Sequence, residues 1–577
     1  MAFRVWAPHA KEVFVVGTFN AWDKAADPLT KQSDGWWSGD VTDAKVGDEY
    51  RYRIVSDRGE ALKIDPYARK VTNSVGNGVI LKAASTNPAP FTPSALNRMV
   101  IYELHVGTFG KRSNDGPGDL EGAIERLHYL RDLGVNAIEV MPLSEFPGGY
   151  SWGYNPAQIF AVESDYGTPA SFRDFMTRAH ELGMAVIVDV VYNHLGPDDL
   201  NLWRFDGWSE NDKGGIYFYN DERAETPWGH TRPDYGRGEV RAFIRDNALM
   251  WIAEYGVDGL RLDATNHIRN RYGHGGPEGQ LAEGWSLLQW INEEVHKVRP
   301  GALTIAEDMQ DDASIVADLQ DDGAGFNTQW DGRFVYEVRQ ALMATDDGER
   351  NLEAIRDVLL HRFGADAFAR VVFTESHDEV ANGKARVPQE VTPDDAGSWL
   401  AKKRSTLGAA LVFTAPGVPM IFQGQEFLED SWFRDDNPVD WSKKDRFAGI
   451  LRLYRDLIRL RLNRDGNTGG LCGQSVDVYH LNADQKVIAY HRWDQAGPGD
   501  SVVTAANFSA EPRQDYRIGL PAEGKWLVRF NSDRKVYDSE FGDVGETPVT
   551  GEAQEYDGQP ASGVVELAPY SAIILSQ

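Results

Sequence analysis

Reactive side chains occur in four short segments in the middle of the chain, and each segment follows an apolar run typical of a buried strand. The segments contain Asp189 and His194, Arg261 and Asp263, Glu307, and His377 and Asp378. A charged group at the end of a buried strand is costly unless it is paired or used. One such segment alone could be a structural ion pair or a helix cap. Because all four would meet at one rim of a parallel sheet, together they favour a reactive site.

Two of these acids have the surroundings that cleavage or transfer of a glycosidic bond requires. Retention of configuration needs a nucleophilic carboxylate and a protonated carboxylic acid about 5 Å apart. Arg261 lies two residues before Asp263, so its positive charge should keep Asp263 ionised as a nucleophile. Glu307 follows an apolar run, so desolvation should raise its pKa and suit it to general-acid work. Asp378 would favour a positively charged transition state.

The elements that position these residues form a repeated unit between residues 98 and 425, in which a helical pattern, a glycine and a short apolar strand recur. The helical pattern from Glu239 to Tyr255, for example, ends at Gly256 before the strand that leads to Asp263. Strands are predicted at residues 100–105, 137–141, 185–191, 257–262, 303–306, 370–373 and 419–422. The repeat predicts an α/β fold, a (β/α)8 TIM barrel whose strand ends carry the chemistry. A doubly wound sheet is the alternative, but it would require a glycine-rich phosphate motif after the first strand.

Short alternating strands flank the barrel on both sides. We expect an N-terminal β-sandwich resembling a carbohydrate-binding module over residues 1–95, the barrel over 96–465 and a C-terminal β-sandwich over 466–577. A proline-rich linker is predicted at residues 87–93, and a long connection at about 195–238 is inserted in the barrel. The aromatic residues of the first domain could stack on sugars or simply fill its core.

Composition limits the class of partner. The chain has 577 residues and a net charge of -29, which disfavours nucleic acid and anionic membranes. A single cysteine, Cys472, excludes an internal disulfide. The chain begins without a signal-peptide pattern and holds no apolar stretch long enough to span a bilayer, so a cytoplasmic location is expected, although a processed secreted form would look the same. A monomer is expected.

The four segments also resemble known motifs. Asp189-Val-Val-Tyr-Asn-His194, Gly259-Leu-Arg-Leu-Asp263, Ile305-Ala-Glu307 and Glu375-Ser-His-Asp378 resemble, in order, the four motifs of the α-amylase superfamily, glycoside hydrolase family thirteen. The resemblance implies a retaining mechanism, with Asp263 as nucleophile, Glu307 as acid/base and Asp378 as transition-state stabiliser. It also implies that the sugar on the non-reducing side of the cut is bound by Asp189, His194, Arg261, His377 and, from a segment resembling the family's stacking tyrosine, Tyr154.

Individual members of the family are harder to separate. Trp152-Gly-Tyr154 and Ser376-His-Asp-Glu379 look like glycogen branching enzymes, whereas Thr226-Pro-Trp-Gly229 looks like maltooligosyltrehalose trehalohydrolases. Glu379 stands where trehalohydrolases usually carry glutamine, and the chain is short for a branching enzyme. We therefore expect an α-glucan hydrolase that cuts internal α-1,4 bonds of starch, glycogen or maltooligosaccharides and transfers chains as a side activity. Branching enzyme and trehalohydrolase are the alternatives, and a non-catalytic glucan-binding protein would be expected to lose one of the three acids.

No cofactor is expected to be required. Calcium is an alternative, because Asn193 sits where calcium-binding amylases place a ligand and the loop after it offers Asp198 and Asp199. Calcium needs six to eight oxygen ligands in protein sites, and the same asparagine occurs in relatives without the ion.

Overall fold

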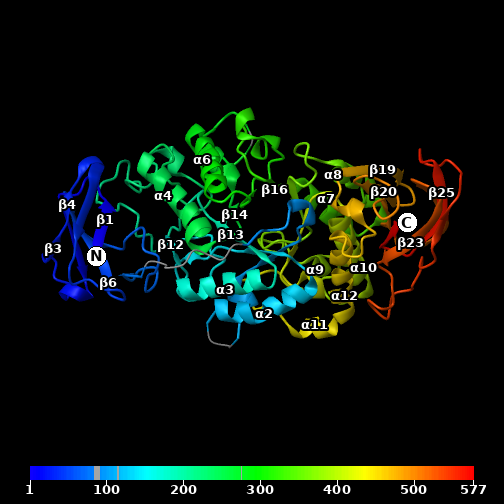
Figure 1. The fold of residues 1–577 in the computed structure, drawn as a ribbon, viewed down its shortest axis with the longest axis horizontal. Helices are drawn as coiled ribbons and strands as arrows, with labels where there is room; N and C mark the ends of the chain where they lie inside the picture. Colours follow the sequence, from blue (N-terminus) through cyan, green and yellow to red (C-terminus); the bar gives the residue numbers. More distant parts are fainter. Residues whose placement is uncertain (83–90, 113–115, 275) are drawn as a thin grey trace.

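The structure is a computed structural model that describes residues 1–82, 91–112, 116–274 and 276–577. Three parts follow one another along its long axis: a β-domain that holds the N-terminus, a central barrel and a β-domain that holds the C-terminus (Figure 1). Most of the linker predicted at residues 87–93 lies outside the described residues. No helix in the described part of the chain is long and apolar enough to cross a membrane.

The central part is a closed barrel of parallel strands in the order β10-β13-β14-β15-β16-β17-β18-β9. Its strands are β9 (Ile101–Leu104), β10 (Ala137–Val140), β13 (Ala185–Val190), β14 (Gly259–Leu262), β15 (Leu303–Ala306), β16 (Thr328–Trp330), β17 (Arg370–Val372) and β18 (Val418–Phe422). The predicted (β/α)8 barrel is therefore confirmed, and the doubly wound alternative was wrong.

Strand β16 is the one barrel strand that the sequence patterns did not predict. It has three residues, and two of them, Thr328 and Gln329, are polar. A run this short and polar carries no apolar signal that could be recognised beforehand. Its closing residue, Trp330, is buried inside the barrel.

Helices surround the barrel, and their ends follow the local sequence. Helix α2 begins where the Asp119 side chain accepts a hydrogen bond from the Gly122 amide, and it ends at Gly134 with φ 108°. The helix before β14 changes to a π-helix at Met250–Tyr255 before Gly256. The principal helices are α2 (Leu120–Leu133), α3 (Pro169–Glu181), α4 (Gly238–Leu249), α6 (Ala282–Val298), α7 (Gly332–Met343), α8 (Leu352–Leu360), α10 (Trp399–Thr414) and α12 (Ala448–Arg461).

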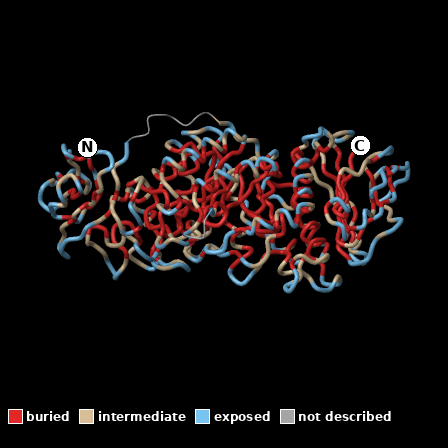
Figure 2. Tube along the Cα trace, turned by 90° about the horizontal axis from the view of Figure 1, so that it is seen from below, coloured by how far each residue is buried: buried red, intermediate tan, exposed pale blue. Residues whose placement is uncertain are grey.

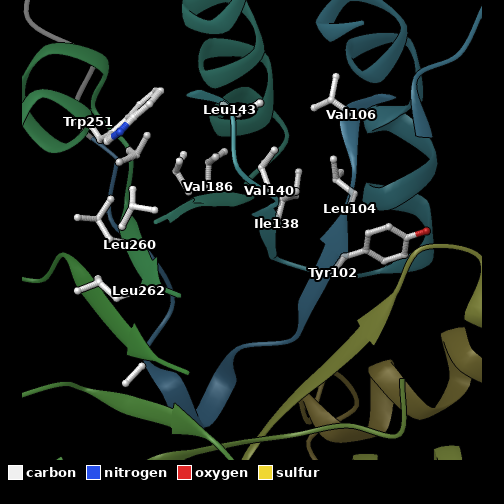
Figure 3. Close-up of a cluster of buried hydrophobic side chains, with 14 of the residues drawn as sticks. Tyr102, Leu104, Val106, Ile138, Val140, Leu143, Val186, Trp251, Leu260 and Leu262 are labelled. Carbon is white, nitrogen blue, oxygen red and sulfur yellow. The ribbon is translucent and has the colours of Figure 1, made fainter. Parts of the chain in front are cut away.

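Alternation along the strands sends one set of apolar side chains outwards to the helices, whereas the barrel interior holds polar groups together with a second apolar cluster that includes Ile187 and Ile305. Leu260 and Leu262 of β14 belong to one buried cluster with Val186 of β13 and Trp251 of the π-helix (Figure 3). Because successive strand residues point to opposite faces, Arg261 faces the barrel interior. Buried residues are most concentrated in this central part of the molecule (Figure 2).

Both flanking parts consist of antiparallel sheets, in agreement with the predicted β-domains. The N-terminal sheets contain β1 (Ala2–Trp6), β5 (Trp36–Asp40) and β4 (Thr30–Lys31), and β3 (Asp27–Pro28), β2 (Glu12–Gly17), β6 (Glu49–Ser56), β7 (Gly59–Lys63) and β8 (Gly78–Val79). The C-terminal sheets contain β19 (Ser475–Asn482), β20 (Val487–Trp493), β21 (Val502–Asn507), β26 (Ser571–Ser576), β23 (Gly524–Asn531) and β24 (Val549–Gly551), and β22 (Arg513–Leu520) with β25 (Ala561–Leu567).

Ion pairs fasten the C-terminal β-domain to the barrel through helix α10. Lys403 is fully buried, and its Nζ lies 2.8 Å from Asp533 Oδ1. Lys402 Nζ lies 2.7 Å from Asp538 Oδ2 and 2.6 Å from Glu540 Oε2. These lysines would be costly to bury without their acidic partners. The acids of the C-terminal domain therefore allow the charged residues of α10 to lie buried at the contact between the two domains.

The connection at residues 195–238 is irregular apart from one short 3-10 turn, Glu222–Ala224. It contacts the N-terminal β-domain, where the Asp206 carboxylate accepts a 2.9 Å hydrogen bond from the His9 amide. The His9 ring also stacks on Trp208, with ring centroids 4.7 Å apart. The long insertion therefore joins the first domain to the rim of the barrel.

Candidate active site

Arg261 is the centre of the site, and three carboxylates surround its guanidinium group. Nη1 lies 2.7 Å from Asp189 Oδ2 and 3.0 Å from Asp263 Oδ1, and Nη2 lies 2.9 Å from Glu307 Oε2. The Arg261 side chain has no exposed surface, and its guanidinium carbon lies 4.4 Å from the ring centroid of Trp330. One buried cation on β14 thus holds acids from β13, β14 and β15 together.

Asp263, the predicted nucleophile, is fixed from its other side by Asn193. The Asn193 amide nitrogen donates a 2.6 Å hydrogen bond to Asp263 Oδ2 and a 2.9 Å bond to the Asp263 carbonyl. Burial raises the pKa of Asp263 above its usual value, and Arg261 and Asn193 oppose that rise. Arg261 was expected to keep Asp263 ionised, and its charge does act in that direction, but desolvation is the larger contribution to the pKa of Asp263.

Glu307, the predicted acid, directs one carboxyl oxygen at the backbone after Asp263. Its Oε2 accepts a 2.8 Å hydrogen bond from the Ala264 amide. Burial raises the pKa of Glu307 to about 7, with further upward contributions from Asp263 and Asp378 and an opposing one from Arg261. The direction agrees with the sequence prediction, and a carboxyl group with this pKa is half protonated near neutral pH.

His377 connects Asp378 to a carboxylate inside the barrel. Its Nδ1 lies 2.5 Å from Glu103 Oε1, and its Nε2 lies 3.7 Å from Asp378 Oδ1. Burial lowers the pKa of His377, but Asp378 and Glu103 outweigh burial and raise it to about 9. The imidazole is therefore positively charged at neutral pH. The Asp378 side chain is 42% exposed, which leaves it open to a substrate.

Tyr154 and His194 complete the predicted sugar-binding set. The Tyr154 ring stacks on His377 at 4.9 Å, and its hydroxyl donates a 2.5 Å hydrogen bond to Asp189 Oδ2. The His194 ring stacks on Trp228 at 4.6 Å. Burial lowers the pKa of His194 to about 4, so its imidazole is neutral at pH 7. The structure thus gathers all eight predicted site residues around one strand-end rim.

Three further residues belong to the site and were not assigned to it from the sequence. Glu103 and Trp330 lie inside the barrel on β9 and β16, and only the inward alternation of their strands could have indicated them. Asn193 was considered only as a calcium ligand, and its amide nitrogen donates a hydrogen bond to Asp263. Glu139 pairs in register with Glu103, and burial raises its pKa well above the usual value.

Replacement of Asn193 by alanine should lower kcat on α-glucan about tenfold to a hundredfold. The substitution removes two hydrogen bonds to the Asp263 segment, and a hydrogen bond to a charged group contributes about 1.5–3 kcal/mol. Initial rates on amylose, measured together with the thermal unfolding midpoint, test this. An unchanged kcat in a folded variant would mean that Asn193 does not position Asp263.

The acidic loop after Asn193 is where the sequence offers Asp198 and Asp199 as calcium ligands. No group of three or more His, Cys, Asp or Glu side chains among the residues that the structure describes could hold an ion. Asp199 Oδ2 instead accepts a 3.0 Å hydrogen bond from the Ser74 hydroxyl of the N-terminal domain.

Sequence comparison identifies the family of this site. Residues 101–228 and 200–459 match the alpha amylase catalytic domain. The chain belongs to the α-amylase family. Residues 1–68 of this family member match carbohydrate-binding module 48, the isoamylase N-terminal domain, and residues 479–577 match the alpha amylase C-terminal all-beta domain. The chain is thus an α-glucan-active enzyme of a family of glycoside hydrolases and transglycosylases.

Similar proteins include several named branching enzymes. The 1,4-alpha-glucan branching enzyme GlgB 1 of Xanthomonas euvesicatoria pv. vesicatoria is 32% identical, over 100% of this chain and 81% of that protein. GlgB of Rhodospirillum rubrum is 31% identical, over 99% of this chain and 79% of that protein. Among solved structures, a pullulanase from Anoxybacillus sp. LM18-11 complexed with maltotetraose has a TM-score of 0.76 at 21% identity, covering 100% of this chain and 86% of its own. That likeness shows the fold alone.

Proposed function

We propose that this α-amylase family member is a glucan chain transferase that makes α-1,6 branches from α-1,4-linked glucan. The observation that carries the proposal is the whole-chain similarity to proteins named 1,4-alpha-glucan branching enzyme. Sequence motifs alone could not separate hydrolysis from transfer, because both activities share the acids that break the bond, and hydrolysis was the interpretation placed first. Whole-chain similarity includes the loops that choose the acceptor, and it therefore supports transfer over hydrolysis.

The geometry supports a double displacement in two balanced steps. The Asp263 carboxylate attacks C1 of the donor glucose, the bond from C1 to O4 breaks, and Glu307 gives its proton to the departing O4. The 6-hydroxyl oxygen of an acceptor glucose then attacks C1, Glu307 takes back the hydroxyl proton, and Asp263 leaves as a carboxylate. Asp378 and the imidazolium of His377 would hold donor hydroxyls while positive charge develops at C1.

Product analysis with amylose tests the proposal. We expect α-1,6 linkages to increase with few new reducing ends, measured by NMR and a reducing-sugar assay. New reducing ends without α-1,6 linkages would overturn branching in favour of an α-1,4 hydrolase.

Trehalohydrolase activity is a second candidate because of the turn Thr226–Gly229. Its central residue, Trp228, lines a cavity together with Glu307 and Asp378, so a segment that resembles trehalohydrolases reaches the candidate active site. Incubation with maltooligosyltrehalose distinguishes the two candidates. Release of free trehalose without branching of amylose would favour the second.

The pH dependence should reflect the raised pKa of Glu307. Only the protonated acid can give a proton to O4, so kcat/KM should decrease as pH rises through about 7. Ionisation of Asp263, whose pKa burial also raises, should produce the opposite limb. Initial rates on amylose between pH 4 and 10 would check both limbs, and a rate still at its maximum at pH 9 would contradict the role of Glu307.

Activity should be insensitive to a chelator. The Asn193 side-chain oxygen, the atom that could ligate calcium, contacts Nδ1 of His194, and the amide nitrogen donates to Asp263. Dialysis against EDTA should therefore leave branching and cleavage rates unchanged. Loss of activity that calcium restores would show that a metal is required.

A further inference from the structure

A cavity of about 240 Å³ opens beside Glu307 and Asp378. Its wall also includes Trp228, Tyr336 and Glu379. The five residues predicted to bind the donor sugar all lie in the described part of the chain, and none of them lines this cavity. The cavity therefore lies on the side of the two acids from which an acceptor sugar would approach C1.

A tight turn after Asp378 brings Lys384, which does not itself line the cavity, against Glu379, which does. Asn382 and Gly383 have φ 55° and 93°, and the Lys384 amide donates a 3.0 Å hydrogen bond to the Ala381 carbonyl. A side chain other than glycine would be strained at the second of these φ values. The turn places the side chain of Lys384 against Glu379, the residue directly after Asp378.

Lys384 and Glu379 form a pair with one buried and one open member. Lys384 Nζ lies 2.9 Å from each carboxylate oxygen of Glu379. The Glu379 side chain is 5% exposed and the Lys384 side chain 45% exposed. The ammonium group of Lys384 has three hydrogens to donate. Among the residues that the structure describes, Glu379 accepts two of these hydrogen bonds. One donor remains for a hydroxyl group of a ligand.

Aromatic surfaces border the same space. Lys384 Nζ lies 5.5 Å from the ring centroid of Tyr336, which is 48% exposed. Trp228 is 42% exposed and contributes another open ring to the cavity wall. A cavity with apolar aromatic faces and a few fixed polar groups suits a sugar ring with its hydroxyl groups.

We propose that Lys384, held in place by Glu379, binds a hydroxyl group of the acceptor glucose and favours that glucose over water. The inference rests on the proposed function, because it concerns the second displacement. There the acceptor oxygen attacks C1, its proton passes to Glu307, and the bond between C1 and Asp263 breaks. An acceptor sugar anchored by Lys384 occupies the path that water would otherwise take.

The test is how the glycosyl-enzyme divides between transfer and hydrolysis. With amylose as donor and a fixed concentration of maltotriose as added acceptor, transfer products are quantified by chromatography and hydrolysis by reducing ends. Lys384→Met should lower the ratio of transfer to hydrolysis about tenfold, as expected for loss of a hydrogen bond from a charged donor. Lys384→Arg keeps the charge and should restore most of the ratio. The matched control is Lys525→Met, an exposed lysine of the C-terminal domain, which should not change it.

The outcomes separate this inference from the proposed function. If the wild type transfers chains and a folded Lys384→Met protein keeps the same ratio of transfer to hydrolysis, only the role of Lys384 is overturned. A wild type that only hydrolyses would overturn branching. The contact with Lys384 could still be tested, because during cleavage the leaving sugar occupies the position proposed for the acceptor sugar. In that case Lys384→Met should raise KM for maltopentaose about tenfold with a smaller effect on kcat, and an unchanged KM would overturn the inference.

Discussion

Asp263→Asn is expected to lower kcat on amylose by about 10⁴-fold, and Glu307→Gln should cause a loss of at least about 10²-fold. The first change removes the group that would form the bond to C1. The second removes the proton that the departing O4 needs. Both substitutions are nearly isosteric, and both retain side-chain oxygens that can accept hydrogen bonds. The losses should therefore arise in the chemical steps and not in folding.

A substrate with a good leaving group distinguishes the two acids. Fluoride departs without protonation, so Glu307→Gln should form the glycosyl-enzyme from α-maltotriosyl fluoride, whereas Asp263→Asn should not. Asp484→Asn, an exposed acid of the C-terminal domain, is the matched control and should retain full activity. Full activity of Asp263→Asn on amylose would mean that another residue carries the attack.

Arg261→Met is expected to destabilise the protein by about 3–5 kcal/mol and to abolish activity, because it breaks a buried ion-pair network. The Arg261 guanidinium lies within 3.0 Å of carboxylate oxygens of Asp189, Asp263 and Glu307. Without it, three acids would share a buried site with no opposite charge between them. Their pKa values would rise further, and Asp263 would be protonated at a pH where the wild type is active.

Unfolding midpoints in urea, compared between wild type and Arg261→Met, measure the effect on stability. The double variant Arg261→Met with Asp189→Asn should regain part of the lost stability, since it removes one of the uncompensated carboxylates. If Arg261→Met unfolded at the same urea concentration as the wild type, the guanidinium would not be the charge that holds these acids together.

Much of the site could be predicted because strand ends of a parallel barrel meet at one rim. Asp189, Asp263, Glu307 and Asp378 each follow an apolar run, and the structure places them at that rim. The contacts between strands could not be predicted in this way. Glu103 and His377 are 274 residues apart in the chain, and no local pattern joins them.

The remaining differences have two physical causes. Strand β16 was not predicted because Thr328 and Gln329 are polar in a strand of only three residues. The pKa of Asp263 depends on how completely the folded protein excludes water from it, and the neighbouring Arg261 is only one contribution. Spacing in the sequence shows which charges are close, but not the cost of burying them.

The most direct measurement is to identify the residue that carries the sugar. Glu307→Gln would be incubated with α-maltotriosyl fluoride, digested and analysed by mass spectrometry, since loss of the acid/base group should slow release of the intermediate. The proposed mechanism predicts a maltotriosyl ester on the peptide that contains Asp263. An ester on a different residue, or the absence of any adduct together with a β-configured product from the wild type, would contradict it.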